Sequence, residues 1–180
     1  LAAEEFDRLR GEVLENRGLE LLAFFHERLK VMLRDAGARH DLVDAVITPR
    51  SDDVLQITQR VEALSAFLSS EDGKNLLVGY RRAVNILVAE EKKDGASFTG
   101  AIALAALKGA EEAALARAVE VAHAGVQHKV STGNYAGAMT SLAQLRAPVD
   151  VFFEKVLVND PDPTLRANRL NLLARLRDTM

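Results

Sequence analysis

Apolar side chains recur at intervals of three and four residues along almost the whole chain, the spacing that lines one face of an α-helix. The stretch from residue 54 to 68 shows this most clearly, with apolar residues at Val54, Ile57, Val61, Leu64, Phe67 and Leu68. No segment alternates apolar and polar residues for long enough to indicate a β-strand. The sequence therefore predicts an all-α fold, a bundle of about eight or nine helices.

Only 4 prolines interrupt this pattern, and several residues mark the ends of helices. Asp72 is expected to cap a helix that ends at Asp94 and Gly95, and Asp162 with Pro163 to open the last helix. The predicted helices cover approximately residues 3–15, 19–36, 73–92, 110–131 and 134–145, with others after Asp41, after Ser51 and from Pro148. The segment 96–109 has no clear assignment, because it is rich in alanine but bounded by glycines.

The composition excludes several classes of protein. The 180 residues contain no cysteine, which excludes disulfide frameworks, thiolate zinc sites and iron–sulfur clusters and fits a reducing cytoplasm. No run of about 18 apolar residues predicts a membrane span. The formal net charge is −3, so a globally basic nucleic-acid-binding protein is excluded, whereas a locally basic face is not. Because the first residue is leucine, we expect the sequence to be a piece of a longer protein.

The pair His40-Asp41 is the nearest approach to a catalytic motif. Such a pair occurs in metal phosphohydrolases, where further ligands, His26 for example, would have to join it. The plainer interpretation is that Asp41 caps the first turn of a helix and His40 lies exposed beside it. Phosphate-binding glycine loops, dinucleotide-binding glycine patterns and nucleophile elbows are absent from the sequence. We therefore expect no catalytic residue and no bound metal in this chain.

The segment 73–93 carries a net positive charge, whereas the net charge of the whole chain is negative. Its polar residues on one helix side are Lys74, Arg81, Asn85 and Lys92, with Arg82 and Lys93 one residue further round. At 100° per residue, the first four fall within an arc of about 40°, opposite an apolar stripe. A ridge of this kind can follow a phosphate backbone, and its arginine and asparagine side chains can reach base edges. The alternative is an ordinary solvated helix face of positive charge.

Two further groups of basic residues occur outside this segment. The helix predicted over 19–36 and the residues after it contribute Arg28, Lys30, Arg34 and Arg39. The last helix contributes Arg166, Arg169, Arg175 and Arg177. Because the arginines of the last helix spread around its circumference, we expect at least one to be structural, pairing with a carboxylate or packing its aliphatic stem.

Four stretches of sequence match a known family in order. Residues 79–87 read Gly-Tyr-Arg-Arg-Ala-Val-Asn-Ile-Leu, and the other stretches are residues 28–46, 145–159 and 165–170. Together they resemble the β subunit of bacterial glycyl-tRNA synthetase, from about Leu19 to the end of the chain. That family often has lysine where this sequence has Arg81. The last two stretches also resemble the anticodon-binding (DALR-like) domain of arginyl-tRNA synthetase and its relatives.

The resemblance implies an all-helical anticodon-binding domain of the class I synthetase type over residues 19–180, with residues 1–18 as a linker or the end of a preceding domain. It implies a subunit that recognises tRNA(Gly), in a cytoplasmic heterotetramer of two α and two β subunits. In that ligase the α subunit activates glycine with ATP and Mg²⁺, so neither cofactor is expected on this segment. We expect the partners to be tRNA, the α subunit and the remainder of the β subunit, with neither DNA nor a membrane among them.

Charge and position, rather than the resemblance, select the candidate tRNA-binding residues. They are Lys74, Arg81, Arg82, Asn85, Lys92 and Lys93 first, Arg28, Lys30, Arg34 and Arg39 second, and Arg166 and Arg169 third. Two alternatives stay open. A helical module that docks onto another subunit or domain without touching RNA would be favoured by exposed apolar surface, and a related synthetase such as arginyl-tRNA synthetase would use the same fold.

Overall fold

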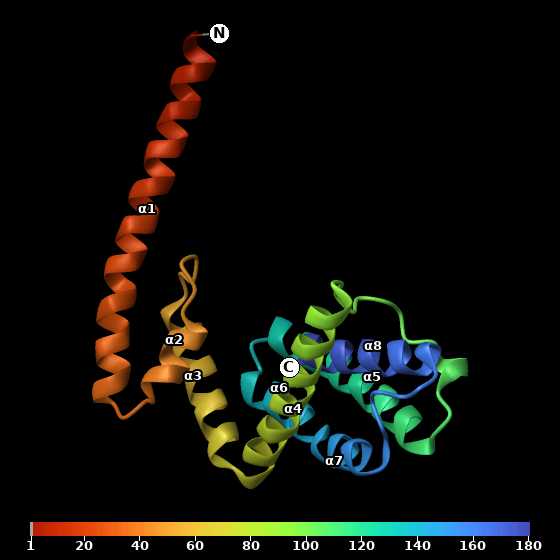
Figure 1. Cartoon of the computed structure of the whole chain (residues 1–180). Helices are drawn as coiled ribbons and strands as arrows, with labels where there is room; N and C mark the ends of the chain where they lie inside the picture. The colour runs from red at the N-terminus through yellow and green to blue at the C-terminus, as the bar shows by residue number, and fades with distance from the viewer. Residues whose placement is uncertain (1) are drawn as a thin grey trace. The chain divides into compact units, whose positions relative to one another are not determined.

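The computed structural model describes residues 2–180, with side chains from Val13 onward, and within these residues all regular secondary structure is helical (Figure 1). The predicted all-α class is confirmed. The chain divides into two compact units, Leu1–Ser65 and Ala66–Met180, and each is described by itself. The expectation that residues 1–18 form a linker or the end of a preceding domain stays a prediction.

The first unit contains α1 (Ala2–Asp35), α2 (His40–Val46) and most of α3 (Val54–Ser69). Its small core brings together residues of all three helices, namely Leu29, Leu33, Val43, Ile57 and Val61. From the described side chains of α1, this core takes two residues of its last turns, Leu29 and Leu33. Gly37, which has a φ of 93°, allows the chain to leave α1 in a left-handed conformation that other residues adopt with strain.

The prediction of two separate helices over 3–15 and 19–36 is wrong, because α1 continues through Gly18 without a break. No atom outside its own helix lies within 4 Å of the position that a Gly18 side chain would take. A glycine inside a helix costs only about 1 kcal/mol relative to alanine, and the helix-forming residues on either side outweigh that cost.

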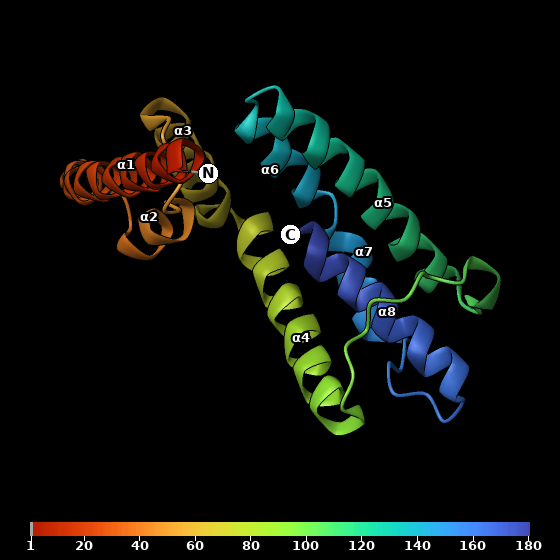
Figure 2. The same ribbon diagram turned by 90° about the horizontal axis from the view of Figure 1, so that it is seen from above.

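The second unit contains α4 (Glu71–Asp94), a 3₁₀ turn η1 (Leu104–Ala106), α5 (Ala110–Ser131), α6 (Tyr135–Ala143), α7 (Arg146–Lys155) and α8 (Pro163–Thr179). Figure 2 shows α8 lying between α4 and α5, and both of these helices contact it. Because neighbours surround α8, it buries side chains on several sides rather than along one stripe. Its fully buried leucines are Leu170, Leu172, Leu173 and Leu176.

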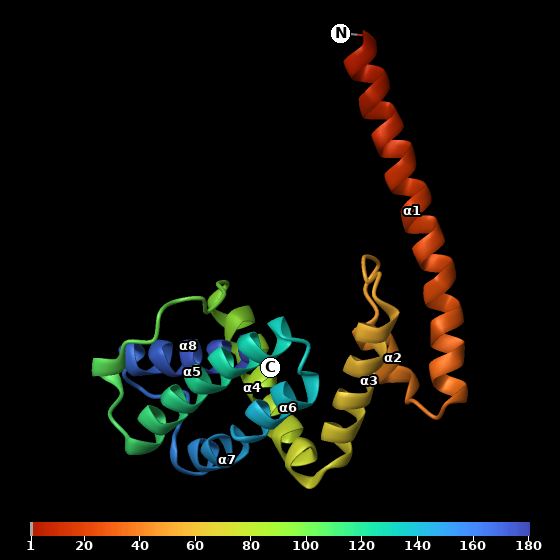
Figure 3. The ribbon, with the colours of Figure 1, turned by 180° about the vertical axis from the view of Figure 1, so that it is seen from behind.

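Hydrogen bonds to α8 hold the segment between α4 and α5, whose structure could not be assigned from the residue pattern. Gly100 donates its backbone N–H to Asn171 Oδ1 at 3.2 Å. Asn168 accepts the N–H of Ala103 at 2.8 Å and donates to the carbonyl of the same residue at 3.1 Å. Figure 3 shows this segment, in green, passing over α8 on its way to α5.

Side-chain caps fix where α4 and α8 begin. Ser70 Oγ accepts the N–H of Gly73 at 3.0 Å, so α4 begins at Glu71 and the prediction of a cap at Asp72 is wrong. Asp72 instead accepts a hydrogen bond from Arg146 on α7 at 2.6 Å. The predicted cap of α8 is confirmed, because Asp162 Oδ1 accepts an amide N–H of the first turn at 2.9 Å.

Candidate nucleic-acid interface

Six exposed residues follow one line along α4, at successive spacings of four and three. They are Lys74, Val78, Arg81, Asn85, Val88 and Lys92, and we call them the α4 row. The row contains no carboxylate, and it extends over about 27 Å at 1.5 Å per residue. On the opposite side of α4, Leu76, Ala83 and Leu87 are buried in the core, so the predicted division of this helix into a polar and an apolar side is confirmed.

The polar residues of the α4 row have no bonding partner in the part of the chain whose side chains are described. Among the described side chains, none forms a hydrogen bond or an ion pair with Lys74, Arg81, Asn85 or Lys92. Their donors are available to a ligand, and no carboxylate from residue 13 onward pairs with the three charges. Lys93, one residue off the row, lies 3.7 Å from Glu90 Oε2 and keeps most of its side chain in solvent.

Arg82 lies beside the row and packs on α7. Its guanidinium carbon is 4.5 Å from the centroid of the Phe153 ring, within the range of a cation–π contact. Phe153 in turn makes an edge contact with the buried Phe152 ring at 5.4 Å. Arg82 therefore joins α4 to α7 while its charge stays at the surface.

The second predicted group belongs to the first unit, and carboxylates occupy most of its charges. Lys30 Nζ lies 2.9 Å from Glu27 and 3.5 Å from Asp44, and Arg34 also lies 3.5 Å from Asp44. Arg39 is paired with Asp41 at 2.6 Å, and this hydrogen bond holds the pKa of the Asp41 carboxyl below its ordinary value.

The remaining member of the second group, Arg28, lies over the Phe24 ring at 4.2 Å. The group as a whole thus lacks the row of unpaired cations that α4 presents.

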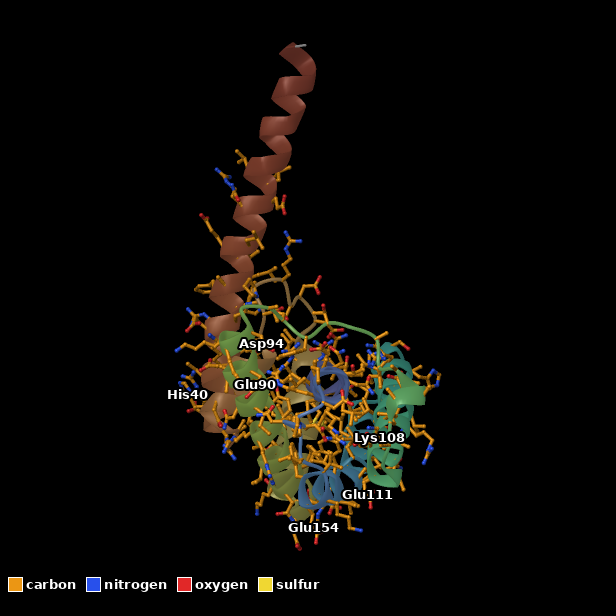
Figure 4. The ribbon with its side chains drawn as sticks, turned by 45° about the vertical axis from the view of Figure 1, so that its right-hand side comes forward. His40, Glu90, Asp94, Lys108, Glu111 and Glu154 are labelled. Carbon is orange, nitrogen blue, oxygen red and sulfur yellow. The ribbon has the colours of Figure 1, made fainter. Side chains whose placement is uncertain are left out.

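The third predicted group is held inside ionic networks of the second unit. Arg166 donates to Asp94 at 2.7 Å and to Glu90, and these hydrogen bonds raise its pKa. Figure 4 shows both carboxylates at the C-terminal end of α4. Bonds from Arg166 and from Asn159 hold the pKa of Glu90 below its ordinary value.

Arg169 is buried and donates to Glu112 on α5, to Asp160 and to the Leu157 carbonyl, each at 2.7 Å. The expectation that at least one arginine of the last helix is structural is confirmed. Sequence reasoning did not identify Glu112 as the partner of Arg169, because 57 residues separate the two.

The two histidines considered as ligands of a phosphohydrolase metal site contact other protein groups instead. His26 is buried with its Nε2 at 2.5 Å from the Ser51 carbonyl oxygen, and His40 Nδ1 lies 3.1 Å from Asp44. Within the described residues, no group of three histidine, aspartate or glutamate side chains is placed to hold a metal ion. A search of the same residues found no helix with the length and apolar character needed to cross a membrane.

Comparison with protein families identifies the family of the helical unit that carries the α4 row. The model of the DALR anticodon binding domain matches residues 76–180, which lie within the second unit and include all of the α4 row except Lys74. The chain therefore belongs to the DALR anticodon-binding domain family.

Two curated relatives narrow the comparison. The glycine–tRNA ligase β subunit of Rhodospirillum centenum is 53% identical over 168 residues, covering 92% of this chain and 24% of the relative. The glycine–tRNA ligase β subunit of Phenylobacterium zucineum is 56% identical over 161 residues, covering 89% of this chain and 24% of the relative. The chain thus spans about a quarter of the length of these relatives, and the similarity extends beyond the DALR region into the first unit.

Proposed function

We propose that this chain is the tRNA-binding part of a glycine–tRNA ligase β subunit and that it recognises the anticodon arm of tRNA(Gly). The observation that carries this proposal is the α4 row, where three cations have no partner among the described side chains, on a protein whose net charge is −3. Most other cations of the second unit are paired with carboxylates. A surface of this kind attracts phosphates through a local field that the net charge does not cancel.

The side chains of the row can both hold and read an RNA loop. Lys74 and Lys92 supply charge for phosphates near the two ends of α4. Glycine anticodons end in two cytosines, which offer an amino donor and carbonyl acceptors. The Asn85 side chain can accept from the amino group, and Arg81 can donate to a carbonyl oxygen. Because loop bases can be splayed out, these edges are accessible in a way that they are not in a duplex.

The wider role proposed for the longer protein extends the family resemblance beyond this segment. The segment would position tRNA(Gly), and glycylation with ATP and Mg²⁺ would take place on the α subunit of a cytoplasmic α₂β₂ ligase. The residues described here supply tRNA binding to that reaction. The anticodon-binding domain of arginyl-tRNA synthetase would share the fold, and the two glycine–tRNA ligase relatives favour the glycine enzyme.

A second role, docking, is favoured for the first unit by the apolar side of α1. Seven large apolar side chains there are at least half exposed, namely Val13, Leu14, Leu21, Phe24, Phe25, Val31 and Met32. Some of them line a groove of 610 Å³. Apolar patches of this extent on a protein surface mark interaction sites. Because the relatives are about four times as long, we propose that another part of the same polypeptide covers this side of α1.

The docking role is tested in the full-length polypeptide. Leu21→Ser combined with Phe25→Ser should increase cleavage near α1 in limited proteolysis and leave tRNA binding unchanged, whereas Glu20→Ser on the same helix should have no effect. If the 180-residue chain dimerises and the double variant abolishes the dimer, the occupant is a second copy and the proposal is wrong.

The tRNA-binding role is tested by fluorescence anisotropy with the 180-residue chain and a labelled anticodon stem-loop of tRNA(Gly). Lys74→Ala combined with Arg81→Ala should weaken binding at least about tenfold, since each removes a contact of about 1 kcal/mol or more. Arg117→Ala is the matched control, because Arg117 is exposed on α5, and it should change the affinity less than twofold. Equal affinities for the parent and the α4 variant would contradict the proposal, and tighter binding to the tRNA(Arg) stem-loop would favour the arginine enzyme.

A further inference from the structure

Two valines interrupt the polar residues of the α4 row. Val78 is 66% exposed and stands between Lys74 and Arg81, and Val88 is 58% exposed and stands between Asn85 and Lys92. The solvent side of a surface helix is usually polar, and lysine, glutamine or glutamate favours a helix more than valine does. Neither core packing nor helix stability therefore accounts for these two side chains.

Building on the proposed function, we propose that Val78 and Val88 contact unstacked bases of a single-stranded RNA loop while the cations of the row hold its phosphates. In a duplex the base faces are stacked against one another, and the outer surface offers mainly phosphates and sugar hydroxyls. An apolar side chain therefore gains little binding free energy at the surface of a duplex. A splayed base exposes an apolar face, which an apolar side chain can cover. The alternation of cations and valines thus selects a loop over a stem.

The charges of the row favour RNA over a protein helix as its occupant. A regular spacing of four and three is also the spacing of helix-to-helix packing, but such a seam is apolar, and here Lys74, Arg81 and Lys92 occupy half of the six positions. Bringing three cations without a carboxylate into a protein interface would require negative partners for all of them. A phosphate backbone supplies those partners along the whole row.

The test compares two RNA probes, the anticodon stem-loop of tRNA(Gly) and a blunt RNA duplex with the sequence of its stem. The variant is Val78→Thr with Val88→Thr, because threonine keeps the β-branched shape and replaces one methyl group by a hydroxyl. We expect the affinity for the stem-loop to fall about tenfold. In the parent chain two valine methyl groups leave water on binding, and the variant loses the free energy of burying them. The slope of affinity against salt should stay the same, since no charge is removed, and binding to the duplex should change less than twofold.

Val121→Thr is the matched control, because Val121 lies on helix α5 of the same unit and is 66% exposed, like Val78. This variant should bind the stem-loop as tightly as the parent chain does. If the valine double variant binds the stem-loop like the parent while Lys74→Ala with Arg81→Ala binds weakly, the inference is wrong and the proposed function stands. An equal loss for stem-loop and duplex also overturns it. A parent chain that binds no stem-loop at all overturns both.

Discussion

The buried ion pair between Arg169 on α8 and Glu112 on α5 allows us to predict how much the free energy of unfolding falls when Arg169 is replaced. The two side chains are 9% and 2% exposed, and Arg169 Nε donates to Glu112 Oε1 at 2.7 Å. Arg169→Met leaves Glu112 buried with one described donor, the N–H of Lys108 at 3.2 Å. A buried charge left without its partner costs about 3–5 kcal/mol. Because one donor remains, we expect a loss of about 3 kcal/mol in the free energy of unfolding.

In a unit of this size, each kcal/mol shifts the Tm by about 4 °C, so the variant should melt about 12 °C lower. Circular dichroism during thermal and guanidinium unfolding measures both quantities. Arg175→Met is the matched control on the same helix, because its pair with Glu120 leaves the side chains 33% and 56% exposed. An exposed pair of this kind contributes less than about 1 kcal/mol.

The double variant Arg169→Met with Glu112→Leu separates the unpaired charge from other effects. Replacing both partners of a buried ion pair by apolar residues is often neutral, so the double variant should regain at least half of the lost stability. A loss below about 1 kcal/mol in Arg169→Met, or a double variant as unstable as the single one, would refute the reasoning, since burial of an uncompensated charge is the assumed cause.

Three further effects on stability are expected. Asp162→Ala should lower the free energy of unfolding by about 1 kcal/mol, because its carboxylate accepts two amide N–H groups of α8; urea unfolding measures this, and Asp162→Asn should retain most of the stability. Gly79→Ala should lower the Tm although alanine favours helices, because the new Cβ would lie 2.6 Å from Val149 Cγ1; a higher Tm would contradict it. Hydrogen bonds from arginines of α8 hold the pKa values of Glu90 and Glu120 below their ordinary 4.5. Because these folded-state values are lowered, the stabilisation is complete above pH 4.5 and is lost as the pH falls through them; equal urea midpoints at pH 6 and pH 3 would argue against these bonds.

The sequence predicted the helical class and the two sides of α4 because both depend on local periodicity. Leu76, Ala83 and Leu87 follow the helical repeat, and the structure buries all three. The predictions from the sequence were wrong where contacts between helices determine the structure. We predicted two helices, over 3–15 and 19–36, but nothing around Gly18 ends α1. The Ser70 cap precedes the predicted cap at Asp72, because Asp72 is bonded to α7 instead.

The candidate site shows the same division. The spacing of Lys74, Arg81 and Lys92 was sufficient to place them on one exposed side. Nothing in the local sequence distinguishes them from Arg166 and Arg169, which have the same type of charge at helical positions. What separates the two groups is the presence of carboxylates around α8. Glu90, Asp94 and Glu112 lie 57 to 76 residues away along the chain from the arginines that they bind.

The dependence of stem-loop affinity on salt tests the central claim most directly. For single-stranded RNA the slope of log K against log salt concentration changes by about 0.7 for each phosphate contact. Replacing Lys74, Arg81 and Lys92 together by glutamine should therefore reduce the magnitude of the slope by about 2, and the same change at Arg117 should leave it unaltered. A triple variant with the slope of the parent chain would show that the α4 row does not meet the phosphates of the RNA.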